Sequence, residues 1–205
     1  MGCVIPIPSH DALRSVPRGT LDKLEAYVNL LNEWQSKVNL VSHNTLKDVW
    51  IRHIADSLSF LPLIPDKSLR IADIGSGAGF PGMVLAIAGC SDVHLFESDR
   101  KKCIFLKEAA RVTDTRITVH NQRAEDVTVD KIALATSRAC GSLSELLNIV
   151  YGWGQENVVC LFSKGQTYGK EIHEAGHWKF EYEVIPSQVD ASGVILKIWN
   201  IGKGS

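Results

Sequence analysis

A cluster of glycines between two apolar segments constrains the fold of this chain more than any other feature of its sequence. The stretch RIADIGSGAGFPGMVLAIAG, residues 70–89, places four glycines within eight residues. Glycine tolerates positive φ angles and lets another group approach the main chain closely. The apolar run before the glycines is typical of a strand, and Pro81 suits the first turn of a helix. The segment therefore predicts a strand, a tight loop against which a ligand lies, and a helix.

The remainder of the chain alternates between strand-like and helix-like patterns. Such alternation predicts an α/β sandwich around a mostly parallel sheet. The last two apolar runs follow each other without a helical segment between them, so we expect an antiparallel pair at the sheet edge. The capping box Ser142-x-x-Glu145 marks a helix start. Strands are expected at 69–75, 92–98, 116–122, 131–139, 157–165, 179–186 and 193–201, and helices at 81–89, 100–112, 142–154 and 167–176.

The first 65 residues follow a different, helical pattern. Apolar residues recur at three- and four-residue steps over 20–38, which predicts an amphipathic helix capped by Thr20. A second helix is expected around 45–60, after a loose arm over 1–18. We therefore divide the chain into an N-terminal arm with helices that pack on the core, 1–65, and an α/β domain, 66–205.

The glycine loop fits two cofactor patterns. Gly77-x-Gly79-x-x-Gly82, with Glu97 twenty residues beyond Gly77, matches the dinucleotide fingerprint. However, the charge of Asp73 before the loop would repel a pyrophosphate, and Pro81 lacks a backbone donor that a pyrophosphate needs. S-adenosylmethionine carries an ammonium and a sulfonium and no phosphate, so it suits an acidic loop better. This favours a methyltransferase over an NAD-linked reductase.

The second pattern is an acidic residue followed by alternating glycines, which is typical of class I, Rossmann-like methyltransferases. In this interpretation Glu97 accepts hydrogen bonds from both ribose hydroxyls of the cofactor. The segment NQRAEDV, residues 121–127, follows the third predicted strand and supplies Glu125 or Asp126 for the adenine amino group. Our reading of the residues thus places Gly77 and Glu97 at S-adenosylmethionine.

Several motifs together make the sequence similar to the RsmG (GidB) family, bacterial methyltransferases that modify guanine N7 in the 530 loop of 16S ribosomal RNA. The resemblance implies contacts to S-adenosylmethionine at Gly75, Phe80, Ala124, Glu125 and Arg138. It also implies 16S ribosomal RNA or the small ribosomal subunit as partner. The motifs are NEWQSKVNLVS (32–42), RHIADSL (52–58), DIGSGAGFPG (73–82), FESDRKKCIFL (96–106), QRAED (122–126), TSRA (136–139) and SKGQ (163–166).

Methylation at guanine N7 requires little chemistry from side chains, because N7 carries an in-plane lone pair and no proton. The enzyme is therefore expected to act by positioning, without a general base. The fourth predicted strand ends in Thr136-Ser137-Arg138 rather than in the Asp/Asn-Pro-Pro-Tyr type of sequence typical of enzymes that methylate exocyclic amines. We expect Arg138 to be catalytic by holding the cofactor carboxylate, guanine O6 or a phosphate.

Basic residues near the predicted strand ends are candidates for RNA contacts, although the net charge of the chain is only −1. These candidates are Arg100, Lys101, Arg123 and Lys164. His53 and Asp56 share one helical face and either dock the N-terminal helices through a hydrogen bond or contact substrate.

Composition points to an ordinary soluble protein. The five cysteines are scattered without a C-x-x-C pair, so we expect reduced thiols, a cytoplasmic location and no metal centre. No apolar run is long enough to span a membrane, and we expect a monomer. Other functions stay open at this point: a methyltransferase of the same fold acting on another RNA, a protein or a small molecule, or a binding module without activity.

Overall fold

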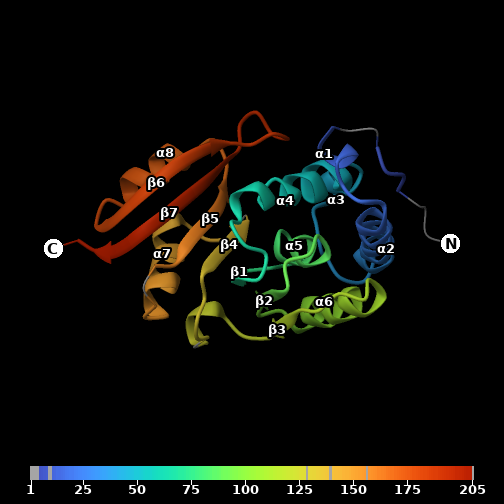
Figure 1. Cartoon of the computed structure of the whole chain (residues 1–205), viewed down its shortest axis with the longest axis horizontal. Helices are drawn as coiled ribbons and strands as arrows, with labels where there is room; N and C mark the ends of the chain where they lie inside the picture. The colour runs from blue at the N-terminus through green and yellow to red at the C-terminus, as the bar shows by residue number, and fades with distance from the viewer. Residues whose placement is uncertain (1–4, 9–10, 128, 139, 156, 205) are drawn as a thin grey trace.

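A computed structural model describes residues 5–8, 11–127, 129–138, 140–155 and 157–204, and within them the chain forms a seven-stranded sheet covered by helices (Figure 1). The strand order is β3-β2-β1-β4-β5-β7-β6. The first five strands pair in parallel, and β7 runs antiparallel to both β5 and β6. The strands are β1 Arg70–Ile74, β2 Asp92–Phe96, β3 Thr118–His120, β4 Leu134–Arg138, β5 Val159–Lys164, β6 Trp178–Pro186 and β7 Val194–Lys203. This confirms the predicted mostly parallel sheet with an antiparallel edge.

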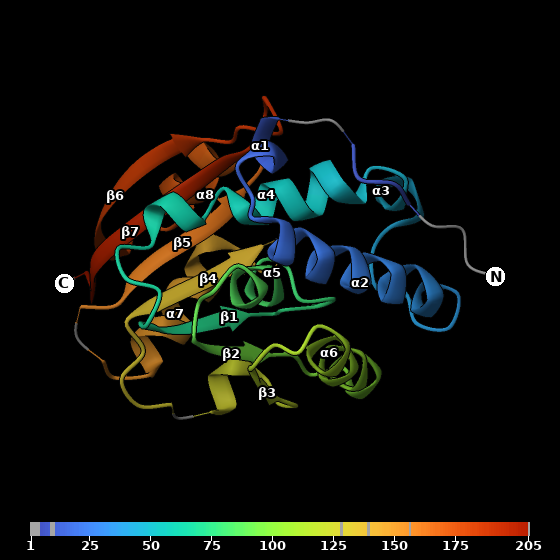
Figure 2. The ribbon, with the colours of Figure 1, turned by 45° about the vertical axis from the view of Figure 1, so that its right-hand side comes forward.

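The helices follow the predicted segments closely. Asp99 caps α6 by accepting hydrogen bonds from two backbone amides, and the capping box of Ser142 and Glu145 opens α7. Helices α2 and α6 lie side by side on one face of the sheet, next to α5 (Figure 2). The helices are α1 Asp11–Arg14, α2 Arg18–Gln35, α3 His43–Leu46, α4 Asp56–Leu58, α5 Gly82–Ile87, α6 Arg100–Val112, α7 Leu143–Gly152 and α8 Tyr168–Glu174, with a π-helix at Trp50–Ala55 and 3-10 turns at Leu61–Leu63 and Ala124–Asp126.

Two details of the N-terminal region differ from prediction. Helix α2 begins at Arg18, with Pro17 at its N-cap, so Thr20 lies inside the helix and the expected cap is wrong. The fixed φ of proline suits a helix start, and this moves the start ahead of the hydroxyl. The second helix is broken into α3, the π-helix 50–55 and α4. Residues 1–4 and 9–10 of the predicted arm, and Ala139, lie outside the described residues.

Alternation along the strands separates two apolar cores. Ile71 of β1 faces a core that includes residues of α2, α5 and α6, whereas Ala72 faces a core that includes α7. Tyr27 and Leu24 of α2 belong to the first core together with residues of β1 and α5. The N-terminal helices therefore share their core with the sheet, and the carboxyl ends of β1, β2 and β4 face the same side as the π-helix 50–55. No described helix has the length and apolar character needed to cross a bilayer.

Candidate active site

An open cleft of about 1150 Å³ lies where the parallel strands end. In open α/β sheets this is the usual place for a ligand. One part of its lining comes from the glycine loop and the ends of β2, β3 and β4. The other part comes from residues 40–42 and 45, the helical segment 52–56 and the loop 187–193 between β6 and β7, and the start of α7 and the end of β5 complete the lining. The cleft thus joins a part beside the predicted cofactor loop to a part bounded by the N-terminal helices.

The glycine loop leaves its backbone bare toward this cleft. Gly75 and Gly77 have φ angles of +66° and +56°, where a side chain is strained. A Cβ on Gly75 would lie 2.3 Å from Sγ of Cys140, so the loop and the segment after β4 are packed together. A Cβ on Gly77 would meet only the Gly75 carbonyl oxygen, at 3.9 Å, and would otherwise enter open space. Gly77 therefore presents open main chain to the cleft.

Asp73 holds this loop from below rather than facing a ligand. Its side chain is fully buried, with one carboxylate oxygen accepting from the Thr136 hydroxyl at 2.8 Å and the other from the Gly82 amide at 3.2 Å. Burial raises the pKa of Asp73 to about 6. The expectation that its charge repels a pyrophosphate in the cleft is therefore wrong, because on β1 the side chain points to the core that contains Ile71. Its role is to tie β1, β4 and α5 together.

Helix α2 also supports this loop, from within the core that contains Ile71. The hydroxyl of Tyr27 donates a hydrogen bond to the carbonyl oxygen of Ala78, and the ring packs against Phe80. A Cβ on Gly79 would approach the Tyr27 hydroxyl at 3.3 Å. The pattern of apolar residues in 20–38 predicts the helix, but it does not single out Tyr27 as a support for the loop.

Glu97 lines the cleft at the end of β2, as predicted. Its two carboxylate oxygens accept from the backbone amides of Gly77 at 2.9 Å and Asp99 at 2.7 Å. These bonds fix the carboxylate plane beside the glycine loop, and each oxygen keeps a further lone pair for a ligand. The arrangement suits a pair of neighbouring hydroxyls.

The segment after β3 forms the next part of the wall. Ala124 is buried, and its carbonyl oxygen accepts from the indole of Trp153 at 3.0 Å. Glu125 lines the cleft and lies 3.8 Å from Arg123, whereas Asp126 is not among the lining residues. Of the two acids considered for the adenine amino group, Glu125 is therefore the better placed.

Arg138 is bound by the N-terminal helices. Its guanidinium donates to the Arg52 carbonyl oxygen at 2.8 Å and to Nδ1 of His53, and it lies 3.4 Å from the Asp56 carboxylate. It also lies over the ring of Phe80, 5.0 Å from the ring centroid. His53 and Asp56 thus dock the N-terminal helices through Arg138, in line with the first expectation. Both also line the cleft, and the alternative that they contact substrate stays a prediction.

His53 is neutral in this arrangement. Burial, together with Arg138 and Arg52, lowers the pKa of His53 to about 3. Because a guanidinium can only donate, Nδ1 is the acceptor and the ring proton is on Nε2. Nε2 is buried and has no hydrogen-bond partner among the described residues. The ring stacks on Phe80 at 4.8 Å.

The predicted RNA-binding residues are not equivalent. Arg123 lines the cleft and is exposed, and Arg100 and Lys101 lie in the exposed first turn of α6 outside its lining. Lys164 is buried, and its amine contacts Glu171 at 2.7 Å and the Gly141 carbonyl oxygen at 2.9 Å. Lys164 lines the cleft as well, but both partners engage its buried amine, which argues against the phosphate contact expected of it. Lys102, which follows Lys101 in the same helical turn, and Arg52 line the cleft as well.

Comparison with known proteins agrees with this geometry. The GidB family model, described as rRNA small subunit methyltransferase G, matches residues 20–194. The chain belongs to this family. It is 43% identical over 203 residues to Ribosomal RNA small subunit methyltransferase G of Rhodospirillum centenum, covering 96% of this chain and 94% of the relative. The protein of the same name from Rickettsia felis is 40% identical over 93% of this chain and 99% of its own length.

Solved structures agree on the fold. The crystal structure of M. jannaschii TYW2 in complex with AdoMet matches with a TM-score of 0.55 and 13% sequence identity, over 80% of this chain and 77% of that chain. A likeness at that identity shows the fold alone. The fold of this GidB-family chain is the Rossmann-like methyltransferase fold, and its N-terminal helix α2 packs on the face of the sheet that α5 and α6 cover.

Proposed function

We propose that this GidB-family protein is an S-adenosylmethionine-dependent methyltransferase that methylates N7 of a guanine in the 530 loop of 16S ribosomal RNA. Family membership supports the coarser statement, a methyltransferase of small-subunit ribosomal RNA. One observation supports the cofactor assignment most directly: Gly77 of the glycine loop opens onto the cleft, and Glu97 is fixed beside it.

The lining of the cleft fits S-adenosylmethionine. Glu97 would hold the ribose hydroxyls, and Glu125 and Ala124 would border the adenine. The backbone at Gly75 and Gly77, both of which line the cleft, would face the amino-acid part. S-adenosylmethionine supplies an activated methyl group on its sulfonium. The aromatic ring of Phe80 lies on the wall of the same cleft. The guanidinium of Arg138 lies over this ring, and the imidazole of His53 stacks on it.

The side chains around Phe80 favour positioning over acid–base chemistry. His53 is neutral through the physiological pH range, and N7 of guanine has no proton to remove. Arg138 uses part of its guanidinium to hold the π-helix 50–55, and its remaining donors suit guanine O6 or a carboxylate. Burial raises the pKa of Cys140, the cysteine beside Gly75, so its thiol is protonated and a poor nucleophile for a base adduct. These features agree with transfer to a ring nitrogen.

Methyl transfer to defined RNA tests this proposal. Ribosomal RNA and small subunits from a strain lacking the modification would be incubated with the protein and labelled S-adenosylmethionine, and the modified nucleoside would be identified by mass spectrometry. We expect 7-methylguanosine in the 530 loop. A different modified nucleoside, or label in protein only, would contradict the proposed substrate. In parallel, S-adenosylmethionine and S-adenosylhomocysteine should both raise the melting temperature, whereas NADH should not.

A further inference from the structure

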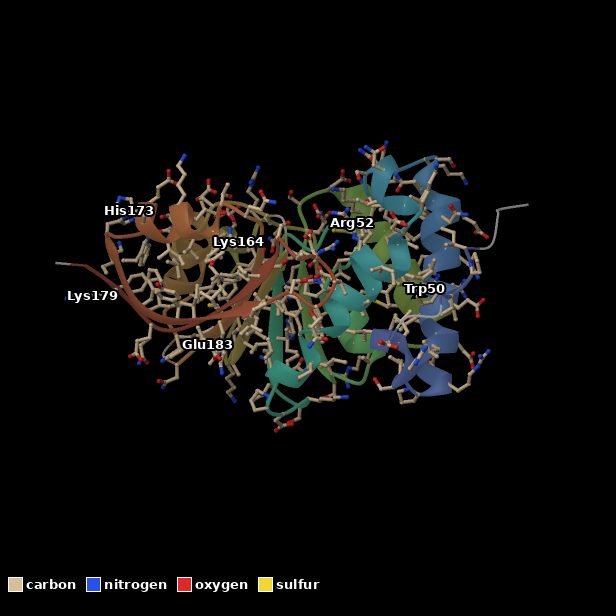
Figure 3. All side chains as sticks on the ribbon, turned by 90° about the horizontal axis from the view of Figure 1, so that it is seen from above. Trp50, Arg52, Lys164, His173, Lys179 and Glu183 are labelled. Carbon is tan, nitrogen blue, oxygen red and sulfur yellow. The ribbon has the colours of Figure 1, made fainter. Side chains whose placement is uncertain are left out.

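An exposed arginine with one weak ion pair lies on the wall of the cleft that the N-terminal helices form. Arg52 of the π-helix 50–55 lines the cleft, and 56% of its side chain is exposed. Within the described part of the chain, its one ion-pair partner is Asp190, at 3.9 Å and itself 48% exposed. An exposed pair at this distance is weak and easily exchanged. Figure 3 shows Arg52 on the N-terminal side of the cleft and Lys164 on the side of the antiparallel strands.

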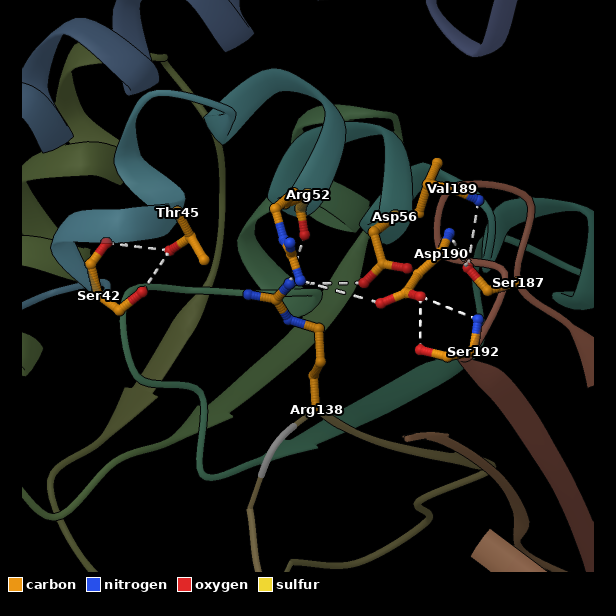
Figure 4. Close-up of polar contacts among 9 residues, drawn as sticks. All are labelled: Ser42, Thr45, Arg52, Asp56, Arg138, Ser187, Val189, Asp190 and Ser192. Atoms are coloured by element: carbon orange, nitrogen blue, oxygen red, sulfur yellow. Dashed lines mark hydrogen bonds and ion pairs between the residues drawn. The ribbon is translucent and has the colours of Figure 1, made fainter. Parts of the chain in front are cut away.

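The neighbouring Arg138 is held by more partners than Arg52. The side chain of Arg138 is only 16% exposed and is bound by a carbonyl oxygen, a ring nitrogen and a carboxylate. In Figure 4 Arg52 and Arg138 approach the same space from opposite sides, with Asp56 and Asp190 beside them. Asp56 compensates the charge of Arg138, and Asp190 that of Arg52. Arg52 therefore keeps most of its five N–H donors available at the cleft.

Asp190 is held firmly, so the exposure of the pair does not come from a loose loop. One oxygen of Asp190 accepts from the amide and the hydroxyl of Ser192, at 2.9 and 2.7 Å. The hydroxyl of Ser187 accepts from the amides of Val189 and Asp190, both at 3.2 Å. The second oxygen of Asp190 points to Arg52. The turn thus fixes a carboxylate at the place where the Arg52 guanidinium rests.

We propose that Arg52 binds a backbone phosphate of the substrate RNA, and that Asp190 holds its guanidinium in place until the phosphate replaces the carboxylate. This inference rests on the proposed function. Arg123 and Lys102 line the cleft near β3, at one edge of the sheet, while Asp190 belongs to the loop that joins β6 and β7 at the other edge. An RNA strand that crosses the cleft then meets a cation on each side. Guanidinium groups recognise phosphate by paired hydrogen bonds.

Two single variants, their combination and one control test the exchange. Arg52→Ala removes the proposed contact. Asp190→Asn removes the competing charge, and its side-chain oxygen can still accept from Ser192. Arg111→Ala is the matched control, since Arg111 is an exposed, ion-paired arginine at the far end of α6. The measurement is binding to a 16S ribosomal RNA fragment that contains the 530 loop, titrated with salt, with S-adenosylhomocysteine affinity and melting temperature measured alongside.

We expect Arg52→Ala to lower RNA affinity about tenfold and to reduce the slope of log affinity against log salt by about one unit, with cofactor affinity unchanged. Asp190→Asn should raise RNA affinity several-fold, and this gain should vanish in the Arg52→Ala background. Arg111→Ala should match the wild type.

Three results would overturn the inference while leaving the proposed function standing. These are wild-type salt dependence in Arg52→Ala, an Asp190→Asn gain that persists without Arg52, and a loss seen only with assembled subunits, which would place Arg52 against a ribosomal protein. Failure of the wild-type protein itself to bind or methylate the RNA would instead overturn the proposed function, and this inference with it.

Discussion

Replacement of Gly77 by alanine tests whether this glycine is needed for the backbone conformation of the loop alone or also for cofactor binding in the cleft. Gly77 has a φ of +56°, and an alanine in this region costs about 1–2 kcal/mol. For a chain of 205 residues this lowers the melting temperature by about 2–8 °C. The added methyl meets no protein atom closer than 3.9 Å, so the protein itself imposes no further penalty.

The cofactor would meet that methyl directly. Extra volume of this size against a closely packed neighbour costs about 1–3 kcal/mol, which corresponds to an affinity roughly 5- to 150-fold weaker. Gly154→Ala is the matched control, because Gly154 has a φ of +65°, no atom within 4 Å of its added Cβ and no place in the lining of the cleft. Both variants should lose similar stability.

Calorimetric titration with S-adenosylmethionine and thermal melting would be run on both variants and on the wild type. We expect cofactor affinity to fall in Gly77→Ala and to stay unchanged in Gly154→Ala. Equal cofactor affinity in the two variants would refute the assignment of the loop. A larger bulge, Gly77→Val, should remove cofactor binding altogether, although a branched side chain in this conformation adds strain of its own.

Three further predictions concern charges in and below the cleft. Because the folded protein raises the pKa of Asp73 from 3.8 to about 6, stability should fall as pH rises through this window, by about 3 kcal/mol in total, and Asp73→Asn should remove that fall in chemical denaturation at pH 3.5–7. Arg138→Ala should cost about 3–5 kcal/mol of stability by leaving Asp56 unpaired, so adding Asp56→Asn should recover stability in melts while methyl transfer stays lost. Arg123→Ala should flatten the salt dependence of RNA binding by about one unit, whereas Lys164→Ala should lower the melting temperature and leave the salt slope unchanged.

Much of the fold could be predicted because its signals are local. Apolar periodicity predicts the strands and helices of the sheet, and the capping box of Ser142 and Glu145 marks the start of α7. Glu97 was predictable for the same reason, since it ends a strand at a fixed spacing from the glycines. The cap at Thr20 was not, because Pro17 starts the helix one turn earlier.

The parts of the site that sequence could not supply depend on contacts between distant segments. Asp73 looks like a ligand-facing acid until β4 brings Thr136 to its carboxylate. In the sequence Lys164 resembles a free cation, but in the folded chain α8 places the Glu171 carboxylate against its amine. Arg52 gains its place in the cleft because the loop 187–193 folds back onto the π-helix 50–55. The sequence shows each of these residues, but it does not show which distant residues they contact in the folded protein.

The loop 187–193 also decides when the cleft is finished during translation. Chains emerge and begin to fold from the N-terminus, so Arg52, the glycine loop and β1 to β5 precede this loop on the ribosome. Strand β7, which follows the loop, lies between β5 and β6 in the sheet, so the loop cannot take its position until the final strand has been made. The growing chain can therefore assemble its cofactor loop early, but the wall that we assign to RNA is completed last. While the chain is still on the ribosome, the wall that we assign to RNA is therefore incomplete.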